Sequence, residues 1–401
     1  MRGRIRLTAV GDIWLQTAGG RHPFEEVGHL VRDKDILFGN LETALSETGE
    51  RAEKHHVIAT SPDAARYLAD AGFDILSVAN NHAGDLGAEG FRNTLDALTS
   101  RGILPVGDRR EPAVIERNGV SVGFIGYATG RSPRGVSINR LVEEDVVRDV
   151  ASLAGECDHI AVSLHWGVEM APYPSPAQID LARRLVDAGA TLILGHHAHT
   201  IQAIERYHGG LISYSLGMFQ FDPRWPHNVS EEAIMLSVDL CAGGVVGEHR
   251  MTPLIVGGDF VPRPAEDERI LSLVDDISRP VADGTLTWSR WFEEVAPAYM
   301  RMNLESYRYR VRRNGILPLL EMGAWFCTPF CLKCCVGLVR RRLRQGPARE
   351  RRAPGRRRAR PPAVSPGAGA ALRAERRGVK WRRAAGRPGP GRKTLITIDD
   401  R

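Results

Sequence analysis

The sequence predicts a layered α/β fold. Short runs rich in Val, Ile and Leu alternate along the chain with amphipathic stretches of helical period. The runs are almost continuously apolar, as in strands that other layers bury on both faces. Polar residues that suit a metal ion follow several of these runs directly. A chain of 401 residues has room for roughly two to three domains of about 150 residues each and for a sizeable core.

The apolar runs predict eight strands, at residues 5–10, 35–38, 74–79, 120–127, 159–164, 191–194, 211–215 and 233–240. Four helices are predicted between them, at residues 62–71, 88–101, 143–154 and 176–188. Ser61 and Ser175 stand where N-caps are expected, and a proline follows each of them in the first turn. The last two strands have no helix between them, which predicts a hairpin and mixed sheets.

The charge is divided between a long acidic part and a short basic tail. Residues 340–401 hold 21 Lys and Arg against 4 Asp and Glu, a net +17, so residues 1–339 carry −11. Arg, Pro, Gly and Ala dominate residues 345–401 without periodicity, which predicts a basic disordered tail. Such a tail suits anionic lipid or nucleic acid, but it has none of the aromatic spacing of a specific nucleic-acid module. A functionless extension fits the same composition.

Before the tail, the chain divides into an α/β domain at 1–260, a helical extension at 261–314 and an apolar, Cys-rich segment at 315–344. In the extension, Trp288, Trp291, Phe292 and Tyr299 have helical spacing and are expected to pack in a core. The longest uncharged run, 322–332, is too short to span a bilayer. Arginines follow it at once, so the segment 315–344 is a candidate for lying at a membrane surface, with cysteines for lipid attachment.

The six cysteines predict no disulfide framework, and their clustered spacing after residue 326 matches no zinc or iron–sulfur pattern well. The N-terminus has neither the apolar core nor the cleavage motif of a secretion signal. We therefore expect a cytoplasmic protein, associated with a membrane only through 315–344.

Polar side chains follow five of the predicted strands, at the edge where α/β sheets build their sites. They are Asp12, Asn40 with Glu42, the run Asn80-Asn81-His82, His165 with Glu169, and the turn Gly195-His196-His197-Ala198-His199. Each has a structural explanation when it is taken alone: a turn cap for Asp12, a surface charge for Glu42, a core histidine for His165. Their shared topological position instead predicts a single site.

The residue types indicate a metal ion. Imidazoles two residues apart cannot share one face of a helix, but in a turn they can converge on one cation. Carboxylates and imidazoles without thiolates suit Mn, Fe, Zn or Mg, as one ion or two. Two ions about 3.5–4 Å apart generate a hydroxide nucleophile and neutralise the oxyanions of a phosphoester. A histidine outside the ligand set can then protonate the leaving oxygen, and His82 is the candidate.

Six short motifs of the chain resemble those of the capsule-synthesis CapA family. In chain order they are Gly-Asp, Asn-Leu-Glu, Ala-Asn-Asn-His, Leu-His-Trp-Gly-x-Glu, Gly-His-His-x-His and Tyr-Ser-Leu-Gly-x-Phe. The resemblance covers about residues 4–240. That family is associated with poly-γ-glutamate biosynthesis and belongs to the metallophosphatase-like, calcineurin-type superfamily. The resemblance implies a two-sheet metallophosphatase-like α/β sandwich flanked by helices, followed here by the helical extension and the tail.

The resemblance assigns six residues to the metal: Asp12, Glu42, Asn81, His165, His197 and His199. It assigns the general acid to His82 and leaves His196 as an extra imidazole, either beside the ligands or as an alternative ligand. Glu169 is assigned to catalysis with His82, as a partner that fixes an imidazole tautomer. Asp85 has the same role or, alternatively, caps the helix that follows it.

Three residues depart from the pattern of metallophosphatases. Trp14 stands where their opening Asp-x-His motif has a metal-binding histidine, and Asn40 stands where the second motif has an aspartate. Both departures are typical of the CapA family itself. Met218 replaces an amide of the family's Tyr-Ser-Leu-Gly-Asn-Phe motif. One firmly held ion is therefore a safer expectation than two.

We expect a metal-dependent, phosphoesterase-like hydrolase associated with capsule or other anionic polymer biosynthesis. A γ-glutamyl amide hydrolase on the same fold is one alternative. A non-catalytic polymer-binding or assembly factor is the other; the missing histidine at Trp14 favours it, whereas the Asn81–His82 pair favours an enzyme.

Overall fold

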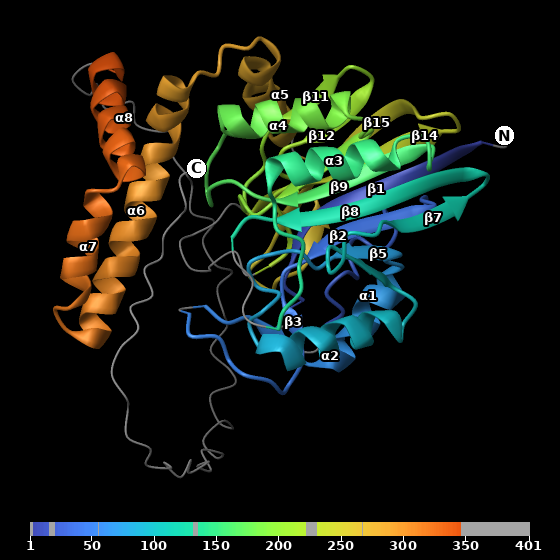
Figure 1. The fold of residues 1–401 in the computed structure, drawn as a ribbon, viewed down its shortest axis with the longest axis horizontal. Helices are drawn as coiled ribbons and strands as arrows, with labels where there is room; N and C mark the ends of the chain where they lie inside the picture. Colours follow the sequence, from blue (N-terminus) through green and yellow to red (C-terminus); the bar gives the residue numbers. More distant parts are fainter. Residues whose placement is uncertain are drawn as a thin grey trace, which may run out of the picture.

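The computed structural model describes residues 3–15, 21–54, 56–130, 135–221, 231–266 and 268–345. It shows an α/β sandwich in which two sheets face each other and helices cover their outer faces (Figure 1). The predicted two-sheet α/β class is therefore confirmed. The predicted disordered tail falls almost entirely on residues 346–401, which lie outside the described residues.

The first sheet has the strand order β16-β15-β14-β1-β2-β5-β6, and β13 pairs with β1 beyond this path. Its parallel part consists of β1 (Arg4–Ile13), β2 (Ile36–Leu41), β5 (Ile75–Ser77), β6 (Leu104–Val106) and β13 (Met218–Gln220). Its antiparallel part consists of β14 (Glu232–Cys241), β15 (Val245–Val256) and β16 (Pro262–Pro264).

The second sheet has the order β11-β12-β10-β9-β8-β7. Its four inner strands are parallel: β8 (Val120–Ala128), β9 (His159–His165), β10 (Leu192–His196) and β12 (Gly210–Ser213). The edge strands β7 (Ala113–Arg117) and β11 (Ile204–Tyr207) are antiparallel to their neighbours. A separate short pair joins β3 (Ala44–Leu45) to β4 (Ala59–Thr60).

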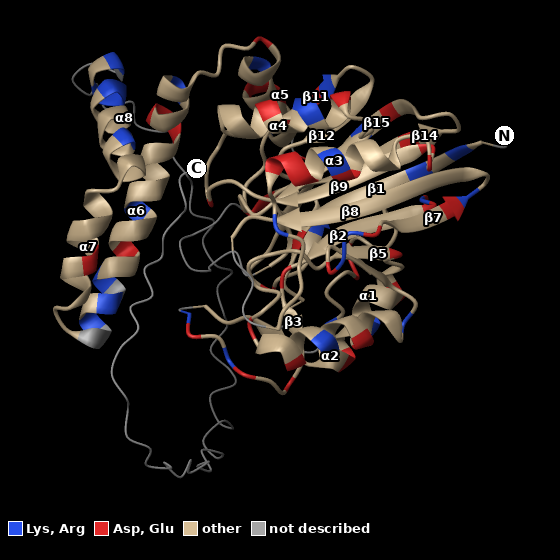
Figure 2. Ribbon diagram, viewed as in Figure 1, with Lys and Arg blue, Asp and Glu red and all other residues tan. Residues whose placement is uncertain are grey.

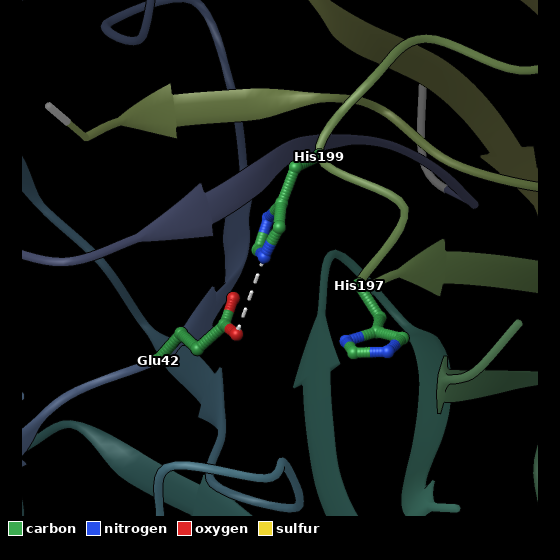
Figure 3. A group of neighbouring side chains, drawn as sticks. All are labelled: Glu42, His197 and His199. Carbon is green, nitrogen blue, oxygen red and sulfur yellow. Dashed lines mark ion pairs between the residues drawn. The ribbon is translucent and has the colours of Figure 1, made fainter. Parts of the chain in front are cut away.

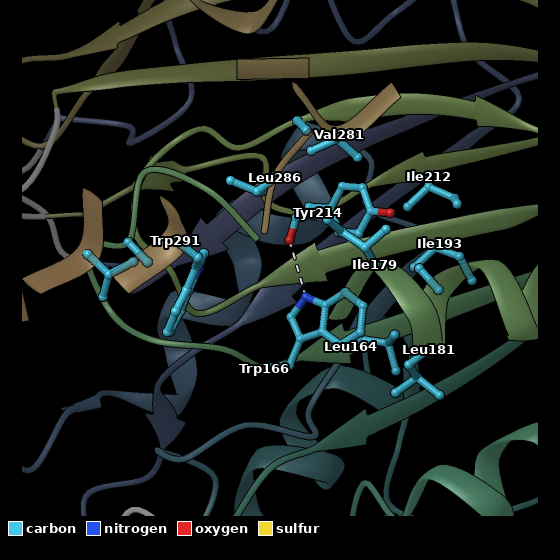
Figure 4. Close-up of a cluster of buried hydrophobic side chains, with 14 of the residues drawn as sticks. Leu164, Trp166, Ile179, Leu181, Ile193, Ile212, Tyr214, Val281, Leu286 and Trp291 are labelled. Atoms are coloured by element: carbon cyan, nitrogen blue, oxygen red, sulfur yellow. Dashed lines mark hydrogen bonds between the residues drawn. The ribbon is translucent and has the colours of Figure 1, made fainter. Parts of the chain in front are cut away.

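Helices cover each sheet on its outer face. The 3-10 turn Pro62–Ala64 leads into α1 (Ala65–Ala71), which lies with α2 (Gly87–Thr99) against the first sheet. The second sheet is covered by α3 (Glu143–Leu153) and α4 (Pro176–Asp187), whose apolar side chains form one core with Ile125, Val162 and Ile193. In that core Trp166 donates from its indole nitrogen to the carbonyl of Tyr214 at 3.2 Å (Figure 4).

The space between the sheets changes character along the strands. Its larger part is an apolar core built by residues such as Phe38, Phe124 and Leu194. Towards the carboxyl ends of the parallel strands, buried polar side chains replace them: Asn40, Ser77, Ser163, His165, His196 and Ser213. The sandwich therefore has an apolar interior and one polar end, and the candidate site lies at that end.

Several predicted elements differ from those observed. Strands β1, β2 and β10 run on through Asp12, Asn40 and His196, because hydrogen bonding to neighbouring strands continues past the apolar runs. The predicted hairpin between residues 211–215 and 233–240 is wrong, since β12 and β14 belong to different sheets. The hairpins are instead β11–β12 and β14–β15, and β15 escaped prediction because most of its residues are only partly buried, which allows polar side chains.

The two predicted caps behave differently. Ser175 forms a complete capping box at α4: its hydroxyl accepts from the Gln178 amide at 3.2 Å, and the Gln178 side chain accepts from the Ser175 amide at 2.9 Å. Ser61 forms no side-chain cap, because the segment after it is a 3-10 turn before α1 begins.

Four helices follow the sandwich: α5 (Glu268–Ala282), α6 (Trp288–Asn314), α7 (Pro318–Phe326) and α8 (Pro329–Gln345). As predicted, Trp291, Phe292 and Tyr299 are buried, and they join the core of the second sheet, whereas Trp288 is 48% exposed. Cys331 and Cys334 are buried in the same core. Burial raises the pKa of the Cys331 thiol to about 12, so this cysteine behaves as a packing residue.

Within the described residues, no single helix has the length and hydropathy of a membrane span. Only α7 and α8 taken together reach those values, and the chain bends by 68° between them.

The close contact of α8 with α6 leads us to expect opposite effects of alanine substitution at two helical glycines. A Cβ at Gly337 would lie 2.5 Å from the carbonyl oxygen of Phe292, whereas a Cβ at Gly323 in α7 meets nothing within 4 Å. We expect Gly337→Ala to lower the free energy of unfolding by about 1–3 kcal/mol. Gly323→Ala should raise it by about 0.4–1 kcal/mol, because alanine restricts the unfolded chain. Urea denaturation of both variants measures this, and a stabilising Gly337→Ala would contradict the packing of α8 on α6.

Candidate metal centre

Asp12 is fully buried near the end of β1, among donors from both sheets. Its Oδ1 accepts from the Asn40 amide at 2.8 Å and lies 3.2 Å from His196 Nδ1. Its Oδ2 lies 3.1 Å from His199 Nδ1. Burial alone would raise the pKa of Asp12, but the imidazoles of His196 and His199 beside it outweigh this effect and hold the pKa well below its ordinary value. Asp12 is therefore a carboxylate at neutral pH.

Glycines let the backbone reach this geometry. A Cβ at Gly11 would lie 2.0 Å from the carbonyl oxygen of Gly217, and one at Gly195 would lie 2.0 Å from that of Tyr214. Any side chain at either position would push neighbouring strands apart. The glycines of the Gly-Asp and Gly-His motifs are thus required by the close approach of the strands that carry the site.

Glu42 follows β2 and is completely buried. Its Oε1 lies 3.6 Å from His165 Nε2 and 3.7 Å from His199 Nε2. Neither carboxylate oxygen accepts a hydrogen bond from any described residue. Burial raises the pKa of Glu42 well above its ordinary value, because nearby histidine charge offsets only part of the desolvation. A buried carboxylate in this position lacks a partner of sufficient charge.

Three imidazoles complete the cluster. His165 ends β9, and the turn after β10 brings His197 and His199 towards Glu42 (Figure 3). This turn is unusual, because His197 and His199 have φ of 85° and 53°, a region that side chains other than glycine seldom adopt. Such strain concentrates at functional sites. The ring of His197 lies 4.6 Å from that of His165, centroid to centroid.

The protonation states suit ligands. Burial lowers the pKa of both His165 and His197, so both are neutral at pH 7 and have a lone pair to donate. Burial also acts to lower the pKa of His199, but Glu42 and Asp12 overcome it and raise the pKa to about 10. In the metal-free protein, His199 therefore supplies the positive charge that partly balances the two carboxylates.

The donor set fits a divalent cation. Ligand atoms from Glu42, His197 and His199 lie within 4.8 Å of one another, as do those from Asp12, Glu42 and His165. Two ligands about 2.1 Å from one ion lie about 3–3.5 Å apart, close to the distances observed around Glu42 Oε1. An ion would also give partners to Glu42 and to the buried Nδ1 of His197, which has no hydrogen-bond partner among the described residues. Oxygen and imidazole donors without thiolate suit Mn, Fe, Zn or Mg. Glu42 belongs to both groups.

Asn81 and His82 lie beside these groups. Asn81 is exposed, yet its side-chain oxygen is 3.1 Å from His165 Nε2. The His82 Nε2 lies 4.0 Å from Glu42 Oε1. Asn80 sets this geometry: its side chain donates to the Leu41 carbonyl at 2.7 Å and accepts from the His82 amide at 3.1 Å. The Asn-Asn-His loop is therefore tied to the strand that ends next to Glu42.

Asp85 and Lys54 hold the other side of the His82 ring. The His82 Nδ1 lies 2.8 Å from Asp85 Oδ2 and 3.2 Å from Lys54 Nζ, and Lys54 forms an ion pair with Asp85. Asp85 is fully buried and also accepts from the Ile58 amide. Of the two roles considered for Asp85, the structure supports the imidazole partner and contradicts the helix cap, since Leu86 is the N-cap of α2.

Glu169 lies half-buried in the loop after β9. Its charge acts to raise the pKa of Glu42, His82, His197 and His199, so it lies at the edge of the cluster. Gly167, which precedes it, has φ of 88°, and a Cβ there would lie 2.7 Å from the Gln178 side chain. The catalytic role of Glu169 stays a prediction.

An apolar wall closes one side of the cluster. Trp14 packs on Phe221 with ring centroids 4.5 Å apart, and Ile58 and Met218 belong to the same buried group. Phe221 in turn lies 5.2 Å from the His199 ring, centroid to centroid. The position where metallophosphatases carry a ligand histidine is thus occupied by an indole that packs with hydrophobic neighbours.

The structure brings together every residue that the sequence assigned to the site, and it adds others. Asn40, a strand-end residue to which the sequence assigns no role, donates to Asp12 and accepts from Asn80 at 3.3 Å, so it links two motifs. Lys54 gave no sequence signal, because it lies in an irregular loop with no motif around it. His196 is buried on the far side of Asp12 and belongs to neither candidate ligand group.

Together, the fold and the cluster define a two-sheet α/β sandwich with a candidate metal site at one end. Residues 6–223 match the family model described as "Bacterial capsule synthesis protein PGA_cap". This match covers more than half of the chain, and the protein belongs to that family.

Its relatives include "Capsule biosynthesis protein CapA" of Bacillus anthracis, 32% identical over 55% of this chain and 61% of that protein. "PGA biosynthesis protein CapA" of Bacillus subtilis is 28% identical over 70% of this chain and 80% of the relative. A "Probable polyglutamine synthesis accessory protein" of Mycobacterium tuberculosis is 30% identical over 66% and 78%. The chain thus spans less than two thirds of the length of the first of these relatives.

Among solved structures, a 5'-nucleotidase precursor from Thermus thermophilus has a TM-score of 0.43 at 18% identity, covering 69% of this chain and 59% of its own. A similarity of this degree supports no statement about activity.

Glu42 offers a test of the metal centre. Glu42→Gln should raise the stability of the metal-free protein at pH 7, because an uncompensated buried charge is removed. Since the raised pKa of Glu42 makes its ionisation costly above the unfolded pKa of about 4.3, this gain should shrink as the pH falls towards 4.5. Mn²⁺ at 100 times its Kd should stabilise the wild type by about 2.7 kcal/mol and the variant far less.

Thermal denaturation with and without Mn²⁺ measures both effects, with Glu156→Gln at an exposed position as the matched control. Equal stabilisation of Glu42→Gln and wild type by Mn²⁺ would rule out Glu42 as a ligand.

The His82 ring offers a second test, through the opposite effects of its two neighbours. The hydrogen bond and charge of Asp85 raise the pKa of His82, whereas the charge of Lys54 lowers it. Asp85→Asn should therefore lower this pKa, and Lys54→Met should raise it. NMR titration of the histidine rings in the metal-free protein measures both shifts, with exposed His208 as an internal reference. Shifts in the same direction would contradict the observed geometry.

Proposed function

We propose that the protein is a metal-dependent hydrolase of capsule synthesis that cleaves a phosphoester in an anionic substrate. The observation that carries the proposal is the carboxylate of Glu42, buried without a hydrogen-bond donor and shared by two groups of potential ligands. Burying such a carboxylate lowers the stability of the fold, and a bound ion would offset that loss. Membership of a capsule-synthesis family supports an anionic polymer or its precursor as substrate.

The ion would be held by Asp12, Glu42, His165, His197 and His199. Asn81 would be a further oxygen ligand next to His165. A bound divalent ion supplies positive charge that lowers the pKa of a water and neutralises developing negative charge on oxygen. Lys54, next to His82, adds positive charge that would attract an anionic group.

His82 is placed to transfer the proton. Its Nδ1 is held by Asp85, so its Nε2 faces the cluster, 4.0 Å from Glu42 Oε1. In hydrolysis, the oxygen of a water bonds to phosphorus, one proton of that water passes to solvent, and the bond from phosphorus to the leaving oxygen breaks. The protonated His82 gives its Nε2 proton to that oxygen, and the neutral ring regains one from solvent. Burial lowers the pKa of His82, so the neutral ring predominates at pH 7, and the protonated fraction is a stronger acid.

A second function, non-catalytic polymer binding during capsule assembly, is favoured by Trp14. With an indole where metallophosphatases have a ligand histidine, one side of the centre lacks a donor. An ion held in this way would serve to fix the strand ends or to hold a polymer carboxylate.

His82→Ala discriminates between the two functions. We expect the Mn²⁺-loaded wild type to hydrolyse an aryl phosphodiester, and the variant to be slower by about 10²–10⁴-fold, as for loss of a general acid. Mn²⁺ affinity, measured by calorimetry, should change less than threefold because His82 is not a ligand. The matched control is His208→Ala, which removes an exposed histidine paired with Asp187.

A γ-glutamyl polymer assayed in parallel tests amide hydrolysis. Turnover of that polymer alone would replace the phosphoester by an amide as the substrate bond. No turnover of either substrate by the metal-loaded protein, with metal binding intact, would overturn the hydrolase proposal in favour of the binding role.

A further inference from the structure

Exposed apolar residues concentrate at the C-terminal end of the described chain. Of the 13 large hydrophobic side chains that are exposed among the described residues, eight lie between residues 316 and 343. Four of them, Ile316, Leu317, Leu319 and Leu320, are at or before the start of α7. The other four are on α8. The remaining five are scattered over the sandwich and α6. A gathering of this kind marks an interaction surface, whereas scattered single residues do not.

On α8 the exposed residues form one stripe. Leu332, Val336, Val339 and Leu343 follow one another at intervals of four, three and four, so they share one face of the helix. They are 50–77% exposed. We call these four residues the outer stripe.

The opposite face of α8 packs on α6. Cys331 and Cys334 are buried there, and Cys331 Sγ lies 3.7 Å from Met300 Sδ. Gly337 lies against the Phe292 backbone, and Arg341 reaches across to the side chain of Glu294 at 2.7 Å. The helix is therefore held by one face, and the outer stripe is directed away from the rest of the protein.

The exposed charged residues of α8 itself are all basic. They are Lys333, Arg340, Arg342 and Arg344, and by helical spacing they lie on both sides of the stripe. Of these, Arg344 is paired with Glu293 of α6. Residues 315–345 contain five basic side chains and one acidic side chain, Glu321, which is paired with Arg310. Figure 2 shows basic residues gathered towards the C-terminal end of α8. The chain up to residue 339 is acidic overall, at −11.

We propose that α7 and α8 form a binding surface for an anionic lipid bilayer. The outer stripe enters the boundary between headgroups and acyl chains, and the flanking lysine and arginines bind the anionic headgroups. Apolar area and basic flanks on one helix are the two features that place a helix in a membrane interface. A second copy of the chain would bring like charges together, since the basic flanks of both copies would meet.

The surface is attached firmly to the sheet that carries the histidines. Trp291 and Phe330 pack together and belong to the same core as the second sheet. The indole nitrogen of Trp291 also donates to the Tyr173 carbonyl at 3.0 Å, in the loop that contains Glu169. A protein bound through α7 and α8 would thus hold the metal centre at a set distance from the membrane.

Vesicle co-sedimentation of the full chain tests the proposal. Vesicles of phosphatidylcholine with 30% phosphatidylglycerol should bind the protein at least tenfold more strongly than pure phosphatidylcholine, in about 0.15 M salt. Leu332→Asp with Leu343→Asp should weaken binding at least tenfold. Val114→Asp with Val245→Asp, at equally exposed apolar positions on β7 and β15, should change it less than twofold.

The basic residues after 345 also attract anionic vesicles, so a second measurement detects insertion itself. Val336→Trp should show fluorescence quenching by lipids brominated in the acyl chain, beyond that of the wild type, and the quenching should survive 0.5 M salt. This measurement does not depend on whether the aspartate variant folds.

Three results would overturn the proposal: equal binding by the stripe and control variants, absence of quenching, or stripe-dependent dimers in light scattering without vesicle binding. The last result would assign the surface to a second copy. The outcome is independent of the proposed hydrolase activity, because the helices contribute no candidate ligand.

Discussion

Two carboxylates buried at the polar end of the sandwich are the constraint on which the rest of the site depends. Asp12 and Glu42 both have no exposed surface, and each lies within 4 Å of imidazole nitrogens from the second sheet. Placing two negative charges in such a volume is costly, and the surrounding residues reduce the cost unequally. Asp12 is satisfied by Asn40, His196 and His199. Glu42 accepts no hydrogen bond from the described residues. This difference between the two carboxylates makes Glu42 the candidate position for a cation.

The two-sheet architecture explains why these groups meet. Asp12 and Asn40 are register partners on adjacent parallel strands of the first sheet, and His165 and His196 are register partners on the second. Because the sheets face each other, the ends of four strands deliver their side chains into one volume. The loops add the remaining groups: His197 and His199 through a strained turn, and His82 through a loop tied to β2 by Asn80. Rigid strands thus fix the first donors, and short loops complete the set.

The C-terminal helices extend the same core without contributing to the centre. Their inner faces continue the packing of the second sheet through Trp291, Phe292 and Tyr299. Their outer faces expose apolar residues between basic ones, although the rest of the described surface has only scattered apolar residues. The packing of the inner faces therefore explains why the helices are stable. It does not explain the exposed apolar residues of the outer faces, which the proposed binding surface does.

The sequence by itself determined the α/β class and which polar residues gather at one end of the strands, because strand ends and motif order are local properties of the chain. The apolar runs located the eight strands that were predicted, and the five other predicted ligands and His82 lie near Glu42 or its neighbours. Only the tertiary structure decided which strands share a sheet, since β12 and β14 have the same local character but pair with different partners. It also decided the roles of Lys54, Asn40 and Asp85, whose chemistry depends on neighbours distant in the chain. The sequence determines which side chains are available, and the contacts between distant segments set the charge and geometry of those side chains.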